Sequence, residues 1–145
     1  MVSVNYLAVV LCGIVSMGLG SLWYGPLFGA AWLKGAGISP ETLEKMKSDP
    51  RMKSKMARSY AIMFIGSIVT AFVLAHSIVF AGSYLHIAGT IAGIEAAIWN
   101  WLGFVAPVTI GMVLWEMKSM KYWLIVSGYS LAYLLIAGVI LANWM

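Results

Sequence analysis

Four long apolar stretches alternate with shorter polar segments along the chain. Each stretch has about 20 residues or more, the length that an α-helix needs to cross the hydrocarbon core of a bilayer. The pattern therefore predicts four transmembrane helices, which cover approximately residues 2–24, 56–80, 87–115 and 122–144. The longest polar segment, residues 25–55, predicts a loop outside the hydrocarbon.

This loop carries local signals for short helices. Ser39 is followed by Pro40 and Glu41, which is typical of a helix start, because a hydroxyl caps the first turn and proline suits its first position. We expect a short helix from there to about Lys47. Apolar side chains at helical spacing in residues 27–32 predict a second short segment that lies in the membrane interface.

The rest of the chain also contains local signals for a helix start, two turns and a kink. Asp49-Pro50 repeats the helix start and should open the second span. Residues 81–86 predict an uncharged turn, and residues 116–121 predict a tight polar turn. Pro107 predicts a kink in the third span.

The third span also carries a strip of small residues along one face. At about 100° per residue, seven positions fall near one line of the helix: Gly89, Gly93, Ala96, Asn100, Gly103, Pro107 and Gly111. In lipid, small residues allow two helix backbones to approach closely, and packing replaces the hydrophobic drive. We expect this strip to pack the bundle together, through Gly89, Gly93, Ala96, Gly103 and Gly111.

Composition agrees with this pattern. Of 145 residues, 62% are hydrophobic and 10% are charged, and the mean hydropathy is +0.92. Soluble proteins carry roughly 25% charged residues, so this chain has too little polar surface for a globule in water. The sequence predicts one all-α polytopic membrane domain over residues 1–145.

The net charge of +4 is unevenly distributed. Seven of the nine basic residues lie between Lys34 and Arg58, and the other two are Lys118 and Lys121. Loops rich in Lys and Arg face the cytoplasm, so the charges predict a protein of the cell membrane with both termini outside and residues 25–55 in the cytoplasm. The same distribution argues against nucleic acid as a partner.

Motifs for chemistry are scarce. Cys12 is the only cysteine, so a thiolate metal site and an internal disulfide are excluded. Phosphate-binding loops, dinucleotide fingerprints and metalloprotease motifs do not occur in the sequence. We therefore expect no enzyme, no cofactor and no metal. The first apolar stretch has no basic region before it, so we expect a retained helix rather than a cleaved signal.

Glu95 is the most informative polar residue, because a carboxylate within a span is costly unless it is neutralised or paired. His76 lies about as far before the turn at 81–86 as Glu95 lies after it, so antiparallel helices would bring the two to one depth. We expect a Glu95–His76 hydrogen bond or ion pair, with Asn100 close by. This polar group predicts either a path for a proton or small cation, or a structural clasp between two spans.

Four basic residues mark the start of the second span: Arg51, Lys53, Lys55 and Arg58. They predict contacts with anionic lipid headgroups, worth about 1 kcal/mol for each charge near a charged surface. The alternative is that these charges only set the orientation of the helix.

Several short motifs resemble those of a family of small four-span prokaryotic membrane proteins of unknown function (DUF1761-like). They are Asn5-Tyr6-Leu7-Ala8, Trp23-Tyr24-Gly25-Pro26-Leu27-Phe28-Gly29 with Trp32, Trp101-Leu102-Gly103-Phe104 and Gly128-Tyr129. In that kind of protein the last pair is often followed by a histidine, but Ser130 stands here. The resemblance implies four helices and a prokaryotic source, and it brings no activity with it.

Two functions remain open at this point. One is an oligomeric transport or permeation element for protons or a small cation or solute, which uses Glu95. The other is a non-catalytic accessory or assembly subunit of a larger membrane complex. A second small-residue face beside Glu95, which includes Ala92, Trp99 and Ala106, favours contact with another subunit in either case.

Overall fold

The computed structural model describes residues 4–144, and all the secondary structure in this range is helical. The elements in order are α1 (Tyr6–Leu22), η1 (Trp23–Leu27), α2 (Gly29–Ala36), α3 (Pro40–Ser48), α4 (Pro50–Leu85), α5 (Gly89–Asn100), η2 (Trp101–Val105), α6 (Ala106–Thr109), α7 (Gly111–Leu114) and α8 (Met120–Trp144). Four stretches are long and apolar enough to cross a membrane: Tyr6–Leu27, Pro50–Leu85, Gly89–Leu114 and Met120–Trp144. The all-α, four-span fold class predicted from the sequence is therefore confirmed.

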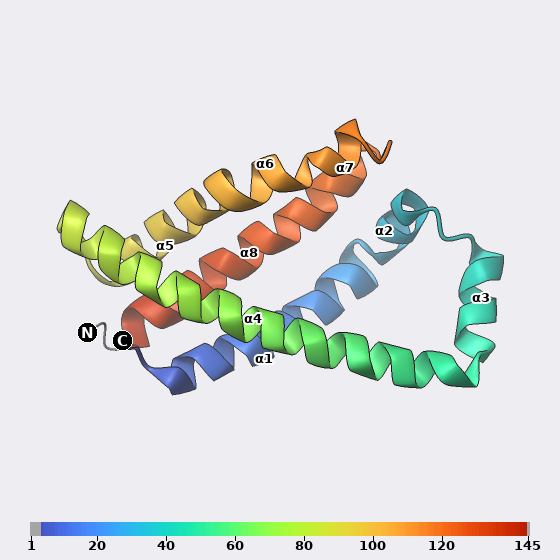
Figure 1. The fold of residues 1–145 in the computed structure, drawn as a ribbon, viewed down its shortest axis with the longest axis horizontal. Coiled ribbons are helices and arrows are strands. Elements are labelled where there is room, and N and C mark those ends of the chain that lie inside the picture. Colours follow the sequence, from blue (N-terminus) through green and yellow to red (C-terminus); the bar gives the residue numbers. More distant parts are fainter. Residues whose placement is uncertain (1–3, 145) are drawn as a thin grey trace.

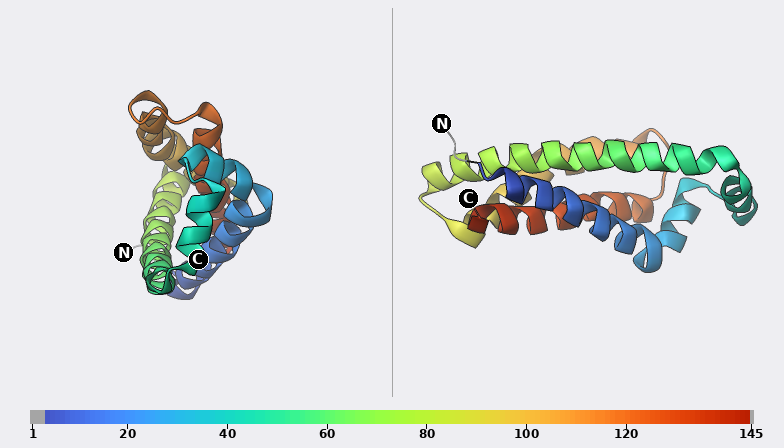
Figure 2. Two further views of the ribbon diagram at one scale, coloured as in Figure 1. Left: turned by 90° about the vertical axis from the view of Figure 1, so that its right-hand side faces the viewer. Right: turned by 90° about the horizontal axis from the view of Figure 1, so that it is seen from below.

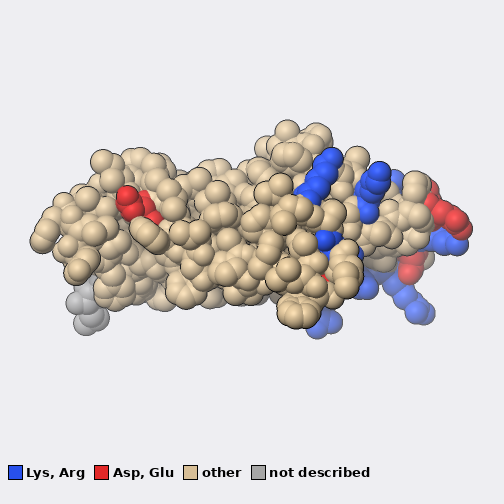
Figure 3. Space-filling view, turned by 90° about the horizontal axis from the view of Figure 1, so that it is seen from above, with Lys and Arg blue, Asp and Glu red and all other residues tan. Residues whose placement is uncertain are grey.

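The spans lie side by side in an elongated bundle (Figures 1 and 2). The start of α1 and the end of α8 meet at one end of the molecule, together with the connection between α4 and α5. The short helices α2 and α3 and the connection from α7 to α8 lie toward the opposite end, where the lysine and arginine side chains gather (Figure 3). Charge is thus concentrated toward one end of the bundle.

Helix α4 is longer than the hydrocarbon is thick. Its 36 residues span about 54 Å at 1.5 Å per residue, against about 30 Å of hydrocarbon. Asp49 caps its start by accepting a hydrogen bond from the Arg51 amide at 2.8 Å. Because four basic residues follow this cap, the first turns of α4 extend beyond the apolar part of the span.

The predicted turn at residues 81–86 is wrong in its position. Helix α4 continues to Leu85 and ends at His86, which adopts a left-handed backbone with φ 55°. Only residues 86–88 connect α4 to α5. Residues 81–85 contain no proline, and a single glycine, Gly82, costs only about 1 kcal/mol in a helix, so the helix continues until the left-handed His86 ends it.

Proline interrupts two of the spans. A π-helical segment, η1, contains Gly25 and Pro26, and Gly25 has a non-helical backbone (φ −98°, ψ −106°). The second π-helical segment, η2, ends two residues before Pro107. Proline has no amide hydrogen to donate and crowds the preceding turn, so the hydrogen-bond ladder shifts there. The break at η1 separates the first span from α2, where a short interfacial segment is expected.

The core consists largely of small side chains. Ala71, Ala75, Ala97 and Ala137 are fully buried, and α5 runs beside α8 (Figure 1). Large apolar side chains instead cover the outside, as for Phe104, which is 74% exposed. This inverted arrangement suits a bundle that is surrounded by lipid rather than water.

Candidate functional site

Hydroxyl groups from three helices meet near the middle of the spans. Ser16 Oγ of α1 lies 2.7 Å from Ser67 Oγ of α4 and 3.0 Å from the hydroxyl of Tyr129 in α8. Tyr133 of α8 donates a hydrogen bond to the Ser67 carbonyl at 2.7 Å. Ser16 is 1% exposed, so this hydroxyl network lies within the bundle.

The directions of these bonds follow from the number of hydrogens. The single hydroxyl hydrogen of Ser67 is donated to the Met63 carbonyl at 2.8 Å, so Ser67 Oγ accepts from Ser16. Ser16 has then used its own hydrogen, so the single hydroxyl hydrogen of Tyr129 is directed at Ser16, where the carbonyl oxygen accepts it at 3.1 Å and Oγ lies 3.0 Å away. The hydroxyl oxygen of Tyr129 therefore keeps unused acceptor capacity.

A cavity of about 490 Å³ adjoins this network. Its polar lining comes from all four spans: Ser16, Ser67, Thr70, Asn100, Tyr129, Ser130 and Tyr133. The rest of its lining is apolar, and no charged side chain of residues 4–144 lines it. Its volume falls in the range of ordinary ligand sites, about 300–1,000 Å³.

Aromatic rings hold Tyr129 in place at the edge of the cavity. Its ring centroid lies 5.2 Å from that of Tyr24 and 6.3 Å from that of Trp23, both in η1. Trp23 also donates its indole hydrogen to the Ile125 carbonyl of α8 at 2.9 Å. The π-helical break thus places aromatic side chains where they support the cavity wall.

The predicted pair of Glu95 and His76 does not form. Glu95 Oε2 accepts a hydrogen bond from Trp99 Nε1 at 3.0 Å, and His76 Nδ1 lies 2.9 Å from the carbonyl oxygen of Phe72. Each side chain bonds to a residue four positions away on its own helix. Equal depth was a correct reason to expect proximity, but it says nothing about the direction in which each side chain points around its helix.

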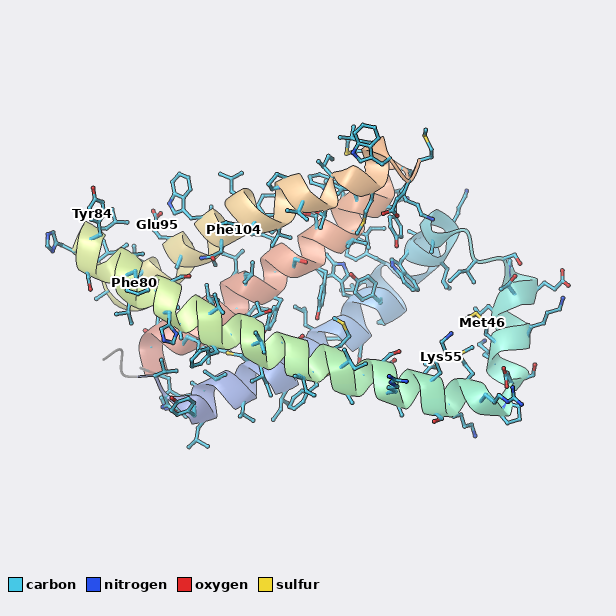
Figure 4. The ribbon with its side chains drawn as sticks, viewed as in Figure 1. Met46, Lys55, Phe80, Tyr84, Glu95 and Phe104 are labelled. Carbon is cyan, nitrogen blue, oxygen red and sulfur yellow. The ribbon has the colours of Figure 1, made fainter. Side chains whose placement is uncertain are left out.

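Glu95 points away from the other helices (Figure 4) and does not line the cavity. Asn100, the third member of the predicted polar group, does line it. One hydrogen of the Asn100 amide is donated to the Ala96 carbonyl at 2.8 Å, which leaves its second hydrogen and its side-chain oxygen for another partner. The structure therefore separates Asn100 from both Glu95 and His76.

The small-residue strip of the third span divides into two parts. A Cβ added at Gly93 would overlap the backbone of Gly138 in α8, and the reverse holds for Gly138. Ala96 is 2% exposed, and a Cβ at Gly89 would lie 3.7 Å from Asn143 Oδ1. A Cβ at Gly103 would meet no atom within 4 Å, and the nearest atom to one at Gly111 belongs to Trp115 of the same span. Only the first part of the strip lies in a helix contact.

The four basic residues of α4, Arg51, Lys53, Lys55 and Arg58, are exposed. None of them forms a salt bridge in residues 4–144, whereas the nearby Lys45 and Lys47 pair with Glu41 and Glu44 of α3 at 2.8 and 3.0 Å. Lys118, at the same end, donates to the Ala36 carbonyl at 3.3 Å and so ties α2 to the start of α8. No cluster of three or more metal-ligating side chains occurs in the described part of the chain.

Sequence reasoning missed the hydroxyl network. Ser16, Ser67, Tyr129 and Tyr133 are common residue types in membrane helices, and the two serines lie in different spans from the two tyrosines, which share α8. The one usable signal is that all of them lie near the middle of a span, where a hydroxyl needs a partner within the protein.

A membrane bundle of four spans, with a largely apolar cavity that hydroxyl groups and one amide also line, is thus the class of protein that the structure defines. Within this class, the chain belongs to the family described as "Protein of unknown function (DUF1761)", whose model matches residues 7–142. No curated protein matches the chain. No solved structure matches it either.

Proposed function

We propose that this protein is a transport or permeation element, in which a small uncharged polar solute binds in the mid-membrane cavity. The observation that carries the proposal is the polar lining that all four spans contribute at about the middle of their lengths. Buried hydroxyls in lipid are useful to a solute that must leave water, because they replace part of its hydration.

The lack of charged side chains among residues 4–144 that line the cavity favours an uncharged solute over a cation. A cation at this depth would need a counter-charge, and the lining supplies none. Glu95, the carboxylate that the sequence suggested as a counter-charge, does not line the cavity. The proposal therefore assigns the binding step to the cavity, not to a proton or cation path through Glu95.

In this proposal the protein lies in the cell membrane with both termini outside. The start of α1 and the end of α8 lie opposite the basic end of the bundle (Figures 1 and 3), and basic segments favour the cytoplasm. Residues 25–55 are then cytoplasmic, and Arg51, Lys53, Lys55 and Arg58 face anionic headgroups. It acts without catalysis and without a cofactor.

Solute flux into proteoliposomes tests the proposal. Swelling after mixing with glycerol, urea or erythritol is followed by light scattering, for the wild type and for Gly66→Leu. Gly66 lines the cavity, and a Cβ there meets no atom within 4 Å, so leucine should enter the cavity without disturbing the fold. We expect faster swelling than in protein-free liposomes for at least one solute, and loss of that increase in Gly66→Leu.

Gly18→Leu is the matched control, because Gly18 is equally open, lies in α1 and does not line the cavity. It should retain the wild-type flux. Folded wild-type protein that accelerates none of the solutes would refute the proposal. A proton flux that Glu95→Gln abolishes and Gly66→Leu leaves intact would move the path back to Glu95.

A second candidate function, that of an assembly subunit, is favoured by the outer face of α5. Glu95 lies about 9 Å into the span at 1.5 Å per residue, and its partner Trp99 is 62% exposed. A carboxylate on a lipid-facing surface at this depth costs a few kcal/mol, and a protein surface that covers it would lower this cost. Contact with a second copy or with another membrane subunit would supply such a surface.

Native mass spectrometry from nanodiscs tests this candidate. Glu95→Gln should shift the protein toward the monomer, whereas Glu116→Gln, in the exposed turn before α8, should leave the assembly unchanged. A wild-type protein that is monomeric in nanodiscs would exclude self-assembly through this face. Assembly that both variants retain would exclude Glu95 from the contact.

A further inference from the structure

We propose that the cavity also binds an amphiphile with an uncharged, hydroxyl-bearing head, which enters sideways from the lipid between α4 and η2. This inference rests on the proposed function only for the use of the cavity as a binding site. It goes beyond that function, because it adds a ligand from the membrane to the small solutes that reach the cavity from water.

The route follows from the walls of the cavity. Its apolar lining includes Val69 and Val73 of α4, which are 56% and 52% exposed, and Phe104 of η2. In contrast, Ser67 and Tyr133 at the back of the same cavity are 6% and 5% exposed. The cavity thus opens toward lipid past exposed apolar side chains and reaches buried hydroxyl groups, which lie beside the buried Leu74 and Leu134.

The packing of the spans leaves this mouth uncovered. Helix α4 packs chiefly against α1, α5 and α8 and has far fewer contacts with η2, α6 and α7. Phe104 of η2, which is labelled in Figure 4, lines the same cavity as Val69 and Val73 of α4. In a bilayer, the molecules that meet this opening are lipids and other apolar chains, so a ligand that enters by this route must carry an apolar part.

The head is defined by the remaining hydrogen-bonding capacity. Beyond the hydrogens already used in the network, Thr70 donates its own to the Gly66 carbonyl at 3.0 Å, and Ser130 donates to the Val126 carbonyl at 3.4 Å. The hydroxyl oxygens of the lining keep free acceptor sites, and the second amide hydrogen of Asn100 is the remaining donor in this lining. Such a surface selects a head that donates hydrogen bonds.

The absence of charged side chains in the lining sets the charge of that head. A phosphate or an ammonium group at mid-membrane depth would have no opposite charge to pair with. A glycerol or other alcohol head needs none. The chemistry therefore points to an uncharged, hydroxylated single-chain lipid rather than a phospholipid.

Photolabelling in phosphatidylcholine vesicles tests the inference. Three chain-matched probes carry a diazirine beside the head: a monoacylglycerol, the fatty acid methyl ester and a lysophosphatidylcholine. Labelled residues of the full chain are identified by mass spectrometry. We expect the monoacylglycerol to label Ser67 or Tyr133 at the back of the cavity, and the two other probes to label only outward-facing residues.

Two test variants, each with its own control variant, separate binding in the cavity from contact with the surface. Gly66→Leu should abolish labelling at the back of the cavity, while Gly18→Leu should retain it. Tyr129→Phe removes an acceptor and should lower the monoacylglycerol labelling about fivefold, as expected for one neutral hydrogen bond, without changing the labelling of outward-facing residues. Tyr84→Phe, at an exposed site on α4, should change neither.

Equal labelling of the cavity by all three probes, or labelling that Gly66→Leu leaves intact, would overturn the inference. If glycerol enters proteoliposomes rapidly and the monoacylglycerol does not label the cavity, the proposed function stands and the sideways route is wrong. If the monoacylglycerol labels the cavity but no solute flux occurs, the site exists and the transport proposal is wrong.

Discussion

The two halves of the third span differ in how they pack. Helix α5 buries Ala92, Gly93, Ala96 and Ala97, whereas η2, α6 and α7 bury no residue. Both halves belong to the same strip of small residues. The difference shows that a small-residue strip produces close packing only where the facing helix is also small, as Gly138 of α8 is opposite Gly93.

The two halves are also tied to α8 by different groups. At the closely packed end, Asn143 of α8 donates to Thr90 Oγ1 of α5 at 2.9 Å. Further along, Trp101 of η2 donates its indole hydrogen to the Ser127 carbonyl at 2.9 Å, and Trp123 donates to Thr109 Oγ1 at 3.0 Å. Indole rings hold two helices farther apart than a pair of glycines does, which leaves room for the cavity.

The largest loss of stability should come from enlarging a glycine in the closely packed half of the third span. Gly93→Leu places a side chain against the Gly138 backbone, so we expect a loss of about 3 kcal/mol in the free energy of unfolding. SDS titration of the protein in mixed micelles measures this value. Gly103→Leu, in the open half of the same strip, should cost little. Equal losses in the two variants would show that the halves do not differ.

An intermediate loss of stability is expected where the start of α1 contacts the end of α8, beside the closely packed half. Asn5 caps α1 by accepting from the Leu7 and Ala8 amides and also donates to the Trp144 carbonyl at 2.9 Å. Asn5→Ala should lower the free energy of unfolding by about 1 kcal/mol, the usual value of an N-cap.

The same titration with Asn5→Asp separates the two roles of this side chain. An aspartate keeps the cap and loses the donor to Trp144, so its stability should lie between those of the wild type and Asn5→Ala. An Asn5→Asp protein as unstable as Asn5→Ala would contradict the importance of the cap.

The smallest effect should come from the hydroxyl network beside the open half. Tyr133→Phe removes the hydrogen bond to the Ser67 carbonyl, and we expect a loss of about 0.6 kcal/mol, the average for hydrogen bonds between membrane helices. SDS titration again measures the change, with Tyr84→Phe as the exposed control. A loss as large as that in Gly93→Leu would mean that the network, rather than backbone contact, holds the bundle together.

Much of the fold could be predicted from the sequence because it depends on local signals. Ser39-Pro40 and Asp49-Pro50 start α3 and α4 where helix capping predicts. The proline at position 107 predicted an irregular helix, and η2 precedes it. The residues that carried the family resemblance have structural roles: Asn5, Trp23 and Trp101 each bond to α8.

The residues of the candidate site were harder to predict from local sequence signals than the fold was. Glu95 stood out because a carboxylate in an apolar span is rare, yet it faces away from the bundle. The serine and tyrosine hydroxyls of the cavity did not stand out, because each becomes significant only beside hydroxyls from other spans. His76 bonds within its own helix, which equal depth in the membrane does not reveal.

The sequence by itself determined that the chain is a four-span helical membrane protein, where α3 and α4 begin and which end carries the charge. Length, hydropathy and capping act on neighbouring residues, so they can be read along one chain. Which faces of the helices meet was decided only by the tertiary structure. Rotation of each helix about its axis depends on how all four pack at once, and that packing joins Gly93 to Gly138, leaves Gly103 open and gathers the hydroxyls of Ser16, Ser67 and Tyr129 beside one cavity.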